Sequence, residues 1–240
     1  MVLKRWEDLP EKIKNEDVKR YYDILSKKRI SLVIKRIFDL VLAIILLIIL
    51  SPLFIIIAIA IKIDSKGPVM FRQTRVTQYG KKFRIFKFRT MITDAEKIGS
   101  QVTTKNDTRI TRIGRVLRKY RLDEIPQLLN IIAGEMSFVG TRPEVSKYVE
   151  KYTDEMMATL LLPAGVTSEA SIQYKDEELI LTNVKNVDEL YVNKVLPEKM
   201  KYNLKSIEDF SLINDMKTIV KTVIAVFKKG EEKAVKNIVS

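Results

Sequence analysis

The chain has 240 residues, of which 46% are hydrophobic and 30% are charged, a composition typical of a folded protein. It contains 43 Lys and Arg against 30 Asp and Glu, a net charge of +13, with neither cysteine nor histidine. These absences exclude a Ser-His-Asp triad, a cysteine nucleophile, a disulfide and a Cys/His zinc site. Acid–base chemistry must use carboxylates, lysine or tyrosine, and any metal must be a hard one such as magnesium. The positive charge indicates nucleic acid, an anionic membrane or a phosphorylated substrate as a partner.

Residues 1–30 form a polar and basic N-terminal segment. Within it, Val18, Tyr21, Tyr22 and Leu25 recur at helical spacing. The pattern predicts either a short amphipathic helix lying on lipid headgroups or a solvated arm, and it favours neither of these.

An apolar run from Ile37 to Ile63 is long enough to reach across a bilayer. Ser51 and Pro52 stand at its centre, and the proline forces the helix to kink or break, while the serine hydroxyl can bond a freed carbonyl. Both ends carry basic flanks, which prefer the cytoplasm. A re-entrant helix over residues 31–66 puts both flanks on one side, whereas the alternative is an ordinary kinked transmembrane helix. The flanks are Lys27, Lys28, Arg29, Lys35 and Arg36 before the run, and Lys62, Lys66, Arg72, Arg75, Lys81 and Lys82 after it.

Two alternating segments follow the Gly67-Pro68 turn signal. Residues 69–73 and 83–88 alternate apolar with polar side chains and predict a β-hairpin that turns around residues 78–80. The polar face is almost wholly Lys and Arg. It suits lipid phosphates or a phosphorylated substrate, although a merely solvated charged face is the usual outcome of such alternation.

Residues 110–121 predict a basic amphipathic helix. Such a helix can lie on a membrane, line an anion pocket or bind nucleic acid. Its apolar positions are Ile110, Ile113, Val116 and Leu117, and its arginines are Arg109, Arg112, Arg115, Arg118 and Arg121.

Asp123 and Glu124 precede Pro126, which is tolerated only in a first helical turn, so a helix is expected to begin near Asp123. The free N–H groups and dipole of a helix N-terminus favour negative charge and would keep Asp123 ionised. Neighbouring side chains diverge by about 100° on a regular helix, so both carboxylates share one site only where the backbone is irregular. The common alternative is an N-cap aspartate followed by a first-turn glutamate.

A loop signal follows at residues 140–143. Gly140 allows a tight turn, Arg142 offers a planar fork of donors for phosphate, and Pro143 is expected to open another helix. The alternative is a structural loop whose arginine pairs with a carboxylate. The remaining expectations are a loop at residues 162–168, amphipathic helices at 189–201 and 211–228, and a basic tail at 229–240.

Five segments, taken in order, resemble the signature stretches of the bacterial sugar transferases, the monotopic phosphoglycosyl transferases. Each segment alone is modest, but five in sequence are highly specific, and the likeness runs from about residue 31 to about residue 226. The segments are Lys35-Arg36-Ile37-Phe38-Asp39, Leu50-Ser51-Pro52, Phe86-Lys87-Phe88-Arg89-Thr90-Met91, Leu122-Asp123-Glu124-Ile125-Pro126-Gln127 and Ser137-Phe138-Val139-Gly140-Thr141-Arg142-Pro143.

The resemblance implies an α/β, mostly helical fold. It has an N-terminal re-entrant membrane helix broken at Ser51 and Pro52, a basic β-hairpin, and amphipathic interfacial helices around the active site. The chain then divides into a basic arm or amphipathic helix (1–30), the re-entrant helix (31–66), a cytosolic catalytic domain (67–228) and a basic tail (229–240).

The resemblance also implies a mechanism in which Asp123 attacks the β-phosphate of a UDP-sugar and releases UMP. Polyprenyl (undecaprenyl) phosphate then attacks the aspartyl phosphosugar and gives a polyprenyl-diphosphate sugar. Glu124 would hold magnesium (Mg²⁺) or orient the site. The phosphate- and substrate-binding positions implied by the motifs are Arg89, Arg118, Arg142 and Pro143.

Two positions depart from the family pattern. Residues 163–172 read Pro-Ala-Gly-Val-Thr-Ser-Glu-Ala-Ser-Ile where many members carry Pro-Gly-Ile/Leu-Thr-Gly-Trp. This resembles a sub-branch of the family and leaves the nucleotide and sugar contacts open. Asn203 stands where many relatives carry an acidic residue, and no role follows for it.

The implied location is the cytosolic face of the bacterial inner membrane, where the enzyme would catalyse the first membrane step of capsule, exopolysaccharide or protein-glycan synthesis. The implied partners are a UDP-sugar, polyprenyl phosphate and anionic lipids of the bilayer. No nucleic acid is expected, and a homodimer is compatible with the sequence although no residue argues for one. The alternative function is a non-catalytic membrane scaffold that binds anionic lipid, with the predicted Asp123 chemistry absent.

Overall fold

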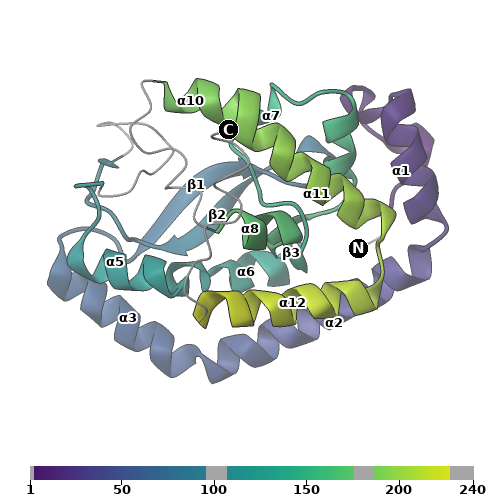
Figure 1. Ribbon diagram of the computed structural model, residues 1–240. Coiled ribbons are helices and arrows are strands. Elements are labelled where there is room, and N and C mark those ends of the chain that lie inside the picture. Colours follow the sequence, from purple (N-terminus) through teal and green to yellow (C-terminus); the bar gives the residue numbers. More distant parts are fainter. Residues whose placement is uncertain (1–2, 96–106, 176–185, 228–240) are drawn as a thin grey trace.

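A computed structural model describes residues 3–95, 107–175 and 186–227 (Figure 1). The predicted basic tail at 229–240 lies outside these residues. The described chain is mostly helical and contains two small sheets, one antiparallel (β1–β2) and one parallel (β3–β4).

The apolar run forms two helices, α2 (Arg29–Ile49) and α3 (Ser51–Asp64), which are bent by 61° where they meet. Pro52 lies in the first turn of α3, where its missing N–H leaves no intrahelical bond unmade. The Ser51 hydroxyl donates to the Ile48 carbonyl at 2.8 Å, so the predicted break and its serine contact are both confirmed. Among the described helices, none could cross a membrane alone by length and composition, whereas this bent pair passes that test together.

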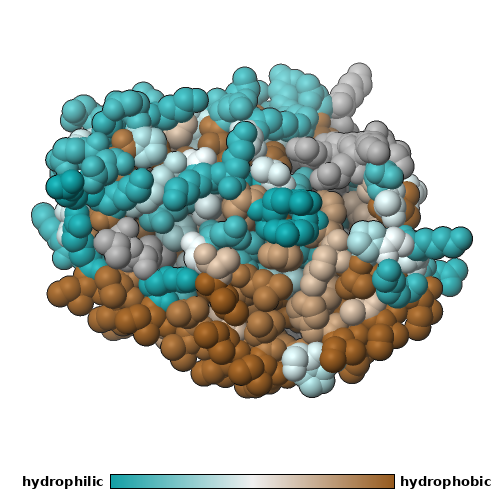
Figure 2. Space-filling view, turned by 180° about the vertical axis from the view of Figure 1, so that it is seen from behind, coloured by the Kyte–Doolittle hydropathy of each residue, from teal (hydrophilic) through white to brown (hydrophobic). Residues whose placement is uncertain are grey.

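Large apolar side chains on α2, α3 and α12 (Leu212–Phe227) are exposed along one side of the molecule. Figure 2 shows this as a hydrophobic belt along the lower rim, and Figure 1 shows α2 and α3 running along the same edge. Ile48, Ile55 and Ile63 are among its most exposed members. Such a continuous apolar surface is typical of a partner or membrane contact rather than of free solvent.

The N-terminal helix α1 (Glu16–Ser26) forms, with Asn15 capping it by accepting from the Val18 N–H at 2.8 Å. Its four predicted apolar positions are all buried against the 3₁₀ segment η5 (Glu155–Leu161) and helix α11 (Leu196–Glu208). The predicted amphipathic helix is therefore confirmed, but its apolar stripe faces the protein rather than lipid headgroups, and the alternative of a solvated arm is wrong. The apolar stripe is satisfied by the protein itself, together with the 3₁₀ turns η1 (Trp6–Asp8) and η2 (Glu11–Ile13).

The hairpin is confirmed: β1 (Met70–Val76) pairs antiparallel with β2 (Lys82–Phe88) around the turn η3 (Gln78–Gly80). Its cations do not all share one solvated face, however. Lys87 follows Phe83 and Ile85 at alternate positions, so it shares their inward face, while Arg84 is exposed.

Between α5 (Arg112–Lys119) and α6 (Gln127–Ile132) the chain reverses through a 3₁₀ turn, η4 (Leu122–Glu124). Arg121 enters this turn with φ of +56°, a left-handed conformation that interrupts the helix. The regular helix begins at Gln127 rather than near Asp123, because Pro126 precedes it.

The segment 162–168, expected to be a loop, instead contributes β4 (Ala164–Thr167), which pairs in parallel with β3 (Met136–Val139). Gly140 and Gly165 pass so close that a Cβ on Gly165 would lie 2.2 Å from the Gly140 N atom. Gly140 therefore serves this close approach rather than a tight turn. Pro143 opens no helix, since α7 begins at Ser146 and ends at Val149.

The C-terminal part is helical, as predicted. A buried ion pair joins α12 to α2, since Lys35 Nζ of α2 lies 2.6 Å from Asp215 Oδ2 of α12. Asp39 of α2 accepts the Ser137 hydroxyl of β3 at 2.7 Å. The elements are α8 (Glu169–Gln173), α10 (Val187–Leu190), a π-helix, η6 (Tyr191–Val195), α11 and α12.

Candidate active site

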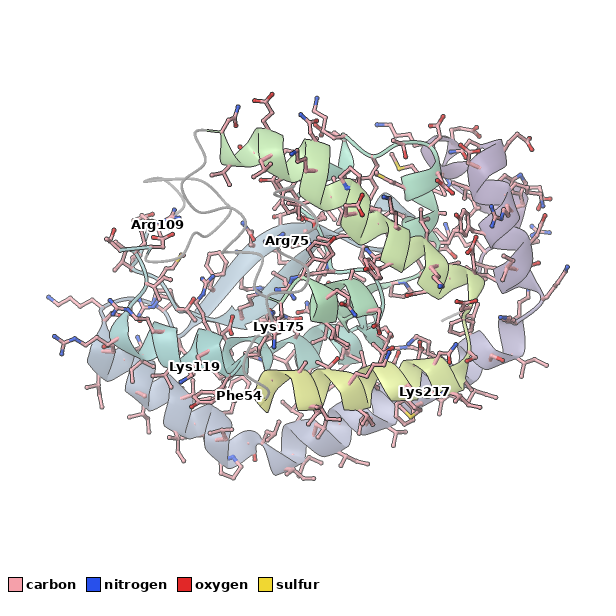
Figure 3. All side chains as sticks on the ribbon, in the orientation of Figure 1. Phe54, Arg75, Arg109, Lys119, Lys175 and Lys217 are labelled. Carbon is pink, nitrogen blue, oxygen red and sulfur yellow. The ribbon has the colours of Figure 1, made fainter. Side chains whose placement is uncertain are left out.

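A cavity of about 1410 Å³ opens between the hairpin, α5, the turn η4 and the C-terminal helices, and we call it the central cavity. The six residues predicted from the sequence to act in catalysis or phosphate binding all contribute to its lining, namely Arg89, Arg118, Asp123, Glu124, Arg142 and Pro143. Arg75 and Lys175 also line it, and Figure 3 labels both in the middle of the view, between α5 and α11.

Asp123 and Glu124 lie in the 3₁₀ turn η4, and each is 8% exposed. The turn is irregular for two reasons. The backbone of Arg121 before it is left-handed, and Pro126 after it has no N–H to bond the carbonyl four residues earlier. This backbone places both neighbouring carboxylates on the central cavity, as a shared site requires.

Cations surround the Glu124 carboxylate. Arg142 Nη2 donates to its Oε1 at 2.5 Å, Lys87 Nζ lies 3.2 Å from the same oxygen, and Arg121 Nη1 lies 3.9 Å away. Burial would raise the pKa of Glu124, but Arg142, Lys87 and Arg121 outweigh it and hold the pKa well below its ordinary value. These three cations therefore favour the ionised carboxylate of Glu124.

The pKa of Asp123 is shifted in the opposite direction. Burial raises the pKa of Asp123 above its ordinary value, the Glu124 charge adds to the rise, and Lys87, Arg118 and Arg142 only partly oppose it. The helix whose dipole was expected to act on Asp123 begins at Gln127 instead, so Asp123 lies in a three-residue turn and burial moves its pKa upward. To the other described residues its carboxylate makes no hydrogen bond, which leaves it available to a ligand.

The predicted arginines divide into two groups. Arg142 contacts Glu124, and Arg118 is close enough to lower the pKa of Asp123 against the effect of burial. The guanidinium of Arg89 instead donates to the backbone carbonyls of Ser65 (2.7 Å) and Lys66, just after α3. Arg89 thus ties the end of the bent helix pair to the cavity wall.

Sequence reasoning missed Lys87 and Arg75, which line the central cavity, and Asn130, which supports a strand of its wall. Lys87 bonds Glu124, and its period-2 spacing from Ile85 was the available signal. Arg75 Nη1 donates to the Pro143 carbonyl at 3.2 Å and supports the loop that carries Arg142. Asn130 is fully buried and accepts the Phe86 N–H at 2.8 Å, which fixes β2 beside α6; no pattern in the sequence marks it.

Asp123 and Glu124 suit a magnesium ion that is also bound by substrate phosphates and water. The described residues contain no cluster of three or more Asp, Glu, His or Cys side chains that could enclose a metal. Magnesium, however, is commonly held by one or two carboxylates together with substrate phosphates and waters. Asp123 and Glu124 provide such a donor set, on a cavity rich in cations that attract phosphate.

Comparisons with known proteins identify the family of the chain. The family model of the bacterial sugar transferases matches residues 30–229. An Aeromonas hydrophila UDP-N-acetylgalactosamine-undecaprenyl-phosphate N-acetylgalactosaminephosphotransferase is 34% identical over 79% of this chain and 43% of its own length. A Komagataeibacter xylinus undecaprenyl-phosphate glucose phosphotransferase is 37% identical over 79% of this chain and 35% of its own.

A Rhizobium leguminosarum exopolysaccharide production protein is 34% identical over 83% of this chain and 98% of its own length. The chain therefore spans less than half of the first two relatives and nearly all of the third. Because the family model matches residues 30–229, the chain belongs to the bacterial sugar transferase family.

Proposed function

We propose that the protein transfers a sugar 1-phosphate from a UDP-sugar to polyprenyl phosphate through a covalent intermediate on Asp123. The observation that carries this proposal is the contrast within the dyad. The Glu124 carboxylate is paired with Arg142 and Lys87, whereas the carboxylate of Asp123 is desolvated and faces the cavity. The names of the relatives, which include undecaprenyl-phosphate sugar phosphotransferases, support the same reaction.

In the first half-reaction, a carboxylate oxygen of Asp123 attacks the β-phosphorus of the UDP-sugar. A bond forms between that oxygen and phosphorus, and the bond from phosphorus to the bridging oxygen breaks. UMP leaves with the electron pair, and the sugar phosphate remains on Asp123. A covalent aspartyl phosphate divides one difficult displacement into two easier ones.

In the second half-reaction, an oxygen of polyprenyl phosphate attacks the same phosphorus, and the Asp123 carboxylate departs. Negative charge builds on phosphate oxygens in both steps. Arg142 and Lys87 lie beside the dyad, and Arg118 lowers the pKa of Asp123, so these three cations are placed to offset that charge. Magnesium, when bound by Glu124 or by both carboxylates, would supply further charge neutralisation.

The bent helix pair provides the route for the lipid. Leu46 and Leu50, beside the break, line the central cavity together with Ala225 and Val226 of α12. The cavity thus reaches from the charged dyad to elements that carry the apolar belt. We propose that α2 and α3 re-enter the cytosolic leaflet of the bacterial inner membrane, so that a water-soluble donor and a long lipid meet at one interface.

The test is UMP release by the purified full chain from UDP-glucose, UDP-galactose and N-acetylated UDP-amino sugars, with undecaprenyl phosphate and magnesium. The matched variant is Asp123→Asn, whose folding is checked by thermal unfolding. Release with one donor, lost in the variant, supports the proposal. Turnover retained by Asp123→Asn would contradict it, and no release with any donor would favour the anionic-lipid scaffold.

A further inference from the structure

The central cavity has a second polar group, away from the dyad, that the reaction as described does not use. It consists of Glu144, Tyr191 and Lys199, which are 7%, 3% and 6% exposed, and all three line the cavity. The Tyr191 hydroxyl donates to Glu144 Oε1 at 2.5 Å, and Lys199 Nζ donates to the Tyr191 oxygen at 3.1 Å. Lys199 Nζ also lies 3.9 Å from Glu144 Oε1. We call these three residues the Glu144 triad.

An unusual backbone assembles the Glu144 triad. Tyr191 and Lys199 are eight residues apart, which on a regular α-helix leaves them about 80° apart around the axis. The π-helix Tyr191–Val195 lies between them and accommodates one extra residue. The pair then behaves as if seven residues apart, within about 20° of one face, and the two side chains meet. π-Helical turns are frequent at functional sites, where they redirect a side chain.

The Glu144 triad is held at a fixed place relative to the dyad. Glu144 follows Arg142 by two residues, and Arg142 is bonded to Glu124. The backbone between them is fastened to β1, because the Val76 N–H donates to the Glu144 carbonyl at 2.9 Å and Arg75 Nη1 donates to the Pro143 carbonyl. A donor with its β-phosphate at Asp123 would therefore meet the Glu144 triad within the same cavity.

The chemistry of the Glu144 triad differs from that of the rest of the cavity. The wall near α5 carries Arg115, Arg118 and Lys119, a cationic surface that suits phosphate. The triad instead combines one carboxylate with one ammonium and one phenol. It presents both acceptors and donors, and Tyr148 adds an aromatic face 4.7 Å from the Tyr191 ring. Neutral hydroxyl groups, rather than phosphate, match such a surface.

We propose that the Glu144 triad binds the sugar hydroxyls of the donor and determines which sugar is transferred. The proposal rests on the proposed function, since it places the donor's β-phosphate at Asp123. It assigns Glu144 as an acceptor for a ring hydroxyl and Lys199 as a donor to one, with Tyr191 aligning both.

The experiment compares kcat/KM for UMP release from UDP-glucose, UDP-galactose and UDP-N-acetylgalactosamine by wild type, Glu144→Gln, Tyr191→Phe and Lys199→Met. We expect the ratio between the preferred and the next sugar to change by at least about tenfold, since a site that hydrogen-bonds a substrate hydroxyl discriminates strongly. Inhibition by UMP, which contains no transferred sugar, should stay within about twofold of wild type. Lys147→Met is the matched control, because Lys147 is exposed, pairs with Asp188 and lies outside the cavity lining.

An equal loss of kcat/KM for all three sugars would overturn the proposal and assign the triad a structural role. A weaker UMP inhibition with an unchanged sugar ratio would also overturn it and place the nucleotide there instead. Tyr191→Phe removes only one oxygen and keeps the test valid should Lys199→Met unfold. If wild type releases no UMP from any of the three donors, the proposed function fails rather than this inference.

Discussion

Arg142 Nη2 lies 2.5 Å from Oε1 of Glu124, and Lys87 Nζ approaches the same oxygen at 3.2 Å. Two cations from separate elements thus converge on one carboxylate, while the adjacent Asp123 carries none of these contacts. The arrangement distinguishes two neighbouring residues of the same charge. One is fixed as part of the scaffold of the site, and the other keeps its oxygens for a substrate.

Replacing Arg142 by lysine should lower kcat/KM for UMP release by about two orders of magnitude. Lysine keeps the charge but loses the planar fork that holds Glu124 and faces phosphate. Steady-state UMP release measures the effect. Arg72→Lys is the control, because Arg72 is exposed on β1, stacks over Phe86 at 3.8 Å and lies outside the cavity lining. Equal losses in both variants would contradict the assigned role of Arg142.

The pH dependence should respond to Lys87. Burial raises the pKa of Asp123, and Lys87 opposes that rise. Removing the ammonium in Lys87→Met should raise the pKa of Asp123 further, so less of the nucleophile is ionised at a given pH. The acid limb of the kcat/KM profile should then move to higher pH, with activity partly recovered at alkaline pH. Lys82→Met, at an exposed position of the same strand, should leave the limb in place; an unmoved limb in Lys87→Met would refute the coupling.

The N-terminal helix should stay on the protein in a bilayer. The single tryptophan, Trp6, packs edge-on against Tyr22 at 5.1 Å and reports on this region. In bilayers with brominated acyl chains, we expect its fluorescence to remain unquenched. Ile55→Trp in a Trp6→Phe background should be quenched strongly, since Ile55 is 61% exposed on α3. Quenching of Trp6 comparable to that of position 55 would show that α1 leaves the core and inserts into lipid.

The bend between α2 and α3 should keep both helix ends on one side of the membrane. The chain has no cysteine, so single cysteines at Lys27 and Lys66 can be labelled without background. A membrane-impermeant maleimide should label both in inverted inner-membrane vesicles and neither in intact spheroplasts. Labelling of the two positions from opposite sides would establish a spanning helix in place of a re-entrant one.

Local signals in the sequence predicted the elements that local physics determines. Pro52 in the middle of an apolar run predicts a break there, and the apolar stripe of α1 predicts a helix but does not reveal what covers it. The covering surface of α1 comes from η5 and α11, more than 100 residues away in the chain, which no local pattern reveals. The parallel pairing of β3 with β4 has the same long-range origin, so residues 164–167 looked like a loop.

The site residues also divide into those that the sequence identified and those whose properties depend on long-range packing. The motifs identified Asp123, Glu124, Arg118 and Arg142, and the structure brings them to one cavity. The raised pKa of Asp123 could not be predicted from its position ahead of α6. Burial causes the rise, and burial depends on the elements packed around the turn. Arg89 has a phosphate-binding residue type, yet its guanidinium is bonded to carbonyls after α3.

The proposed reaction requires a covalent sugar phosphate on Asp123. Purified protein would be mixed with its UDP-sugar and magnesium without polyprenyl phosphate, quenched in acid, and analysed by intact mass and peptide mapping, beside Asp123→Asn. We predict a mass increase equal to one sugar phosphate, located on Asp123, released on addition of polyprenyl phosphate and absent from the variant. A wild-type protein that transfers sugar phosphate to polyprenyl phosphate while Asp123→Asn does so at a comparable rate, or an adduct on another residue, would contradict Asp123 as the nucleophile.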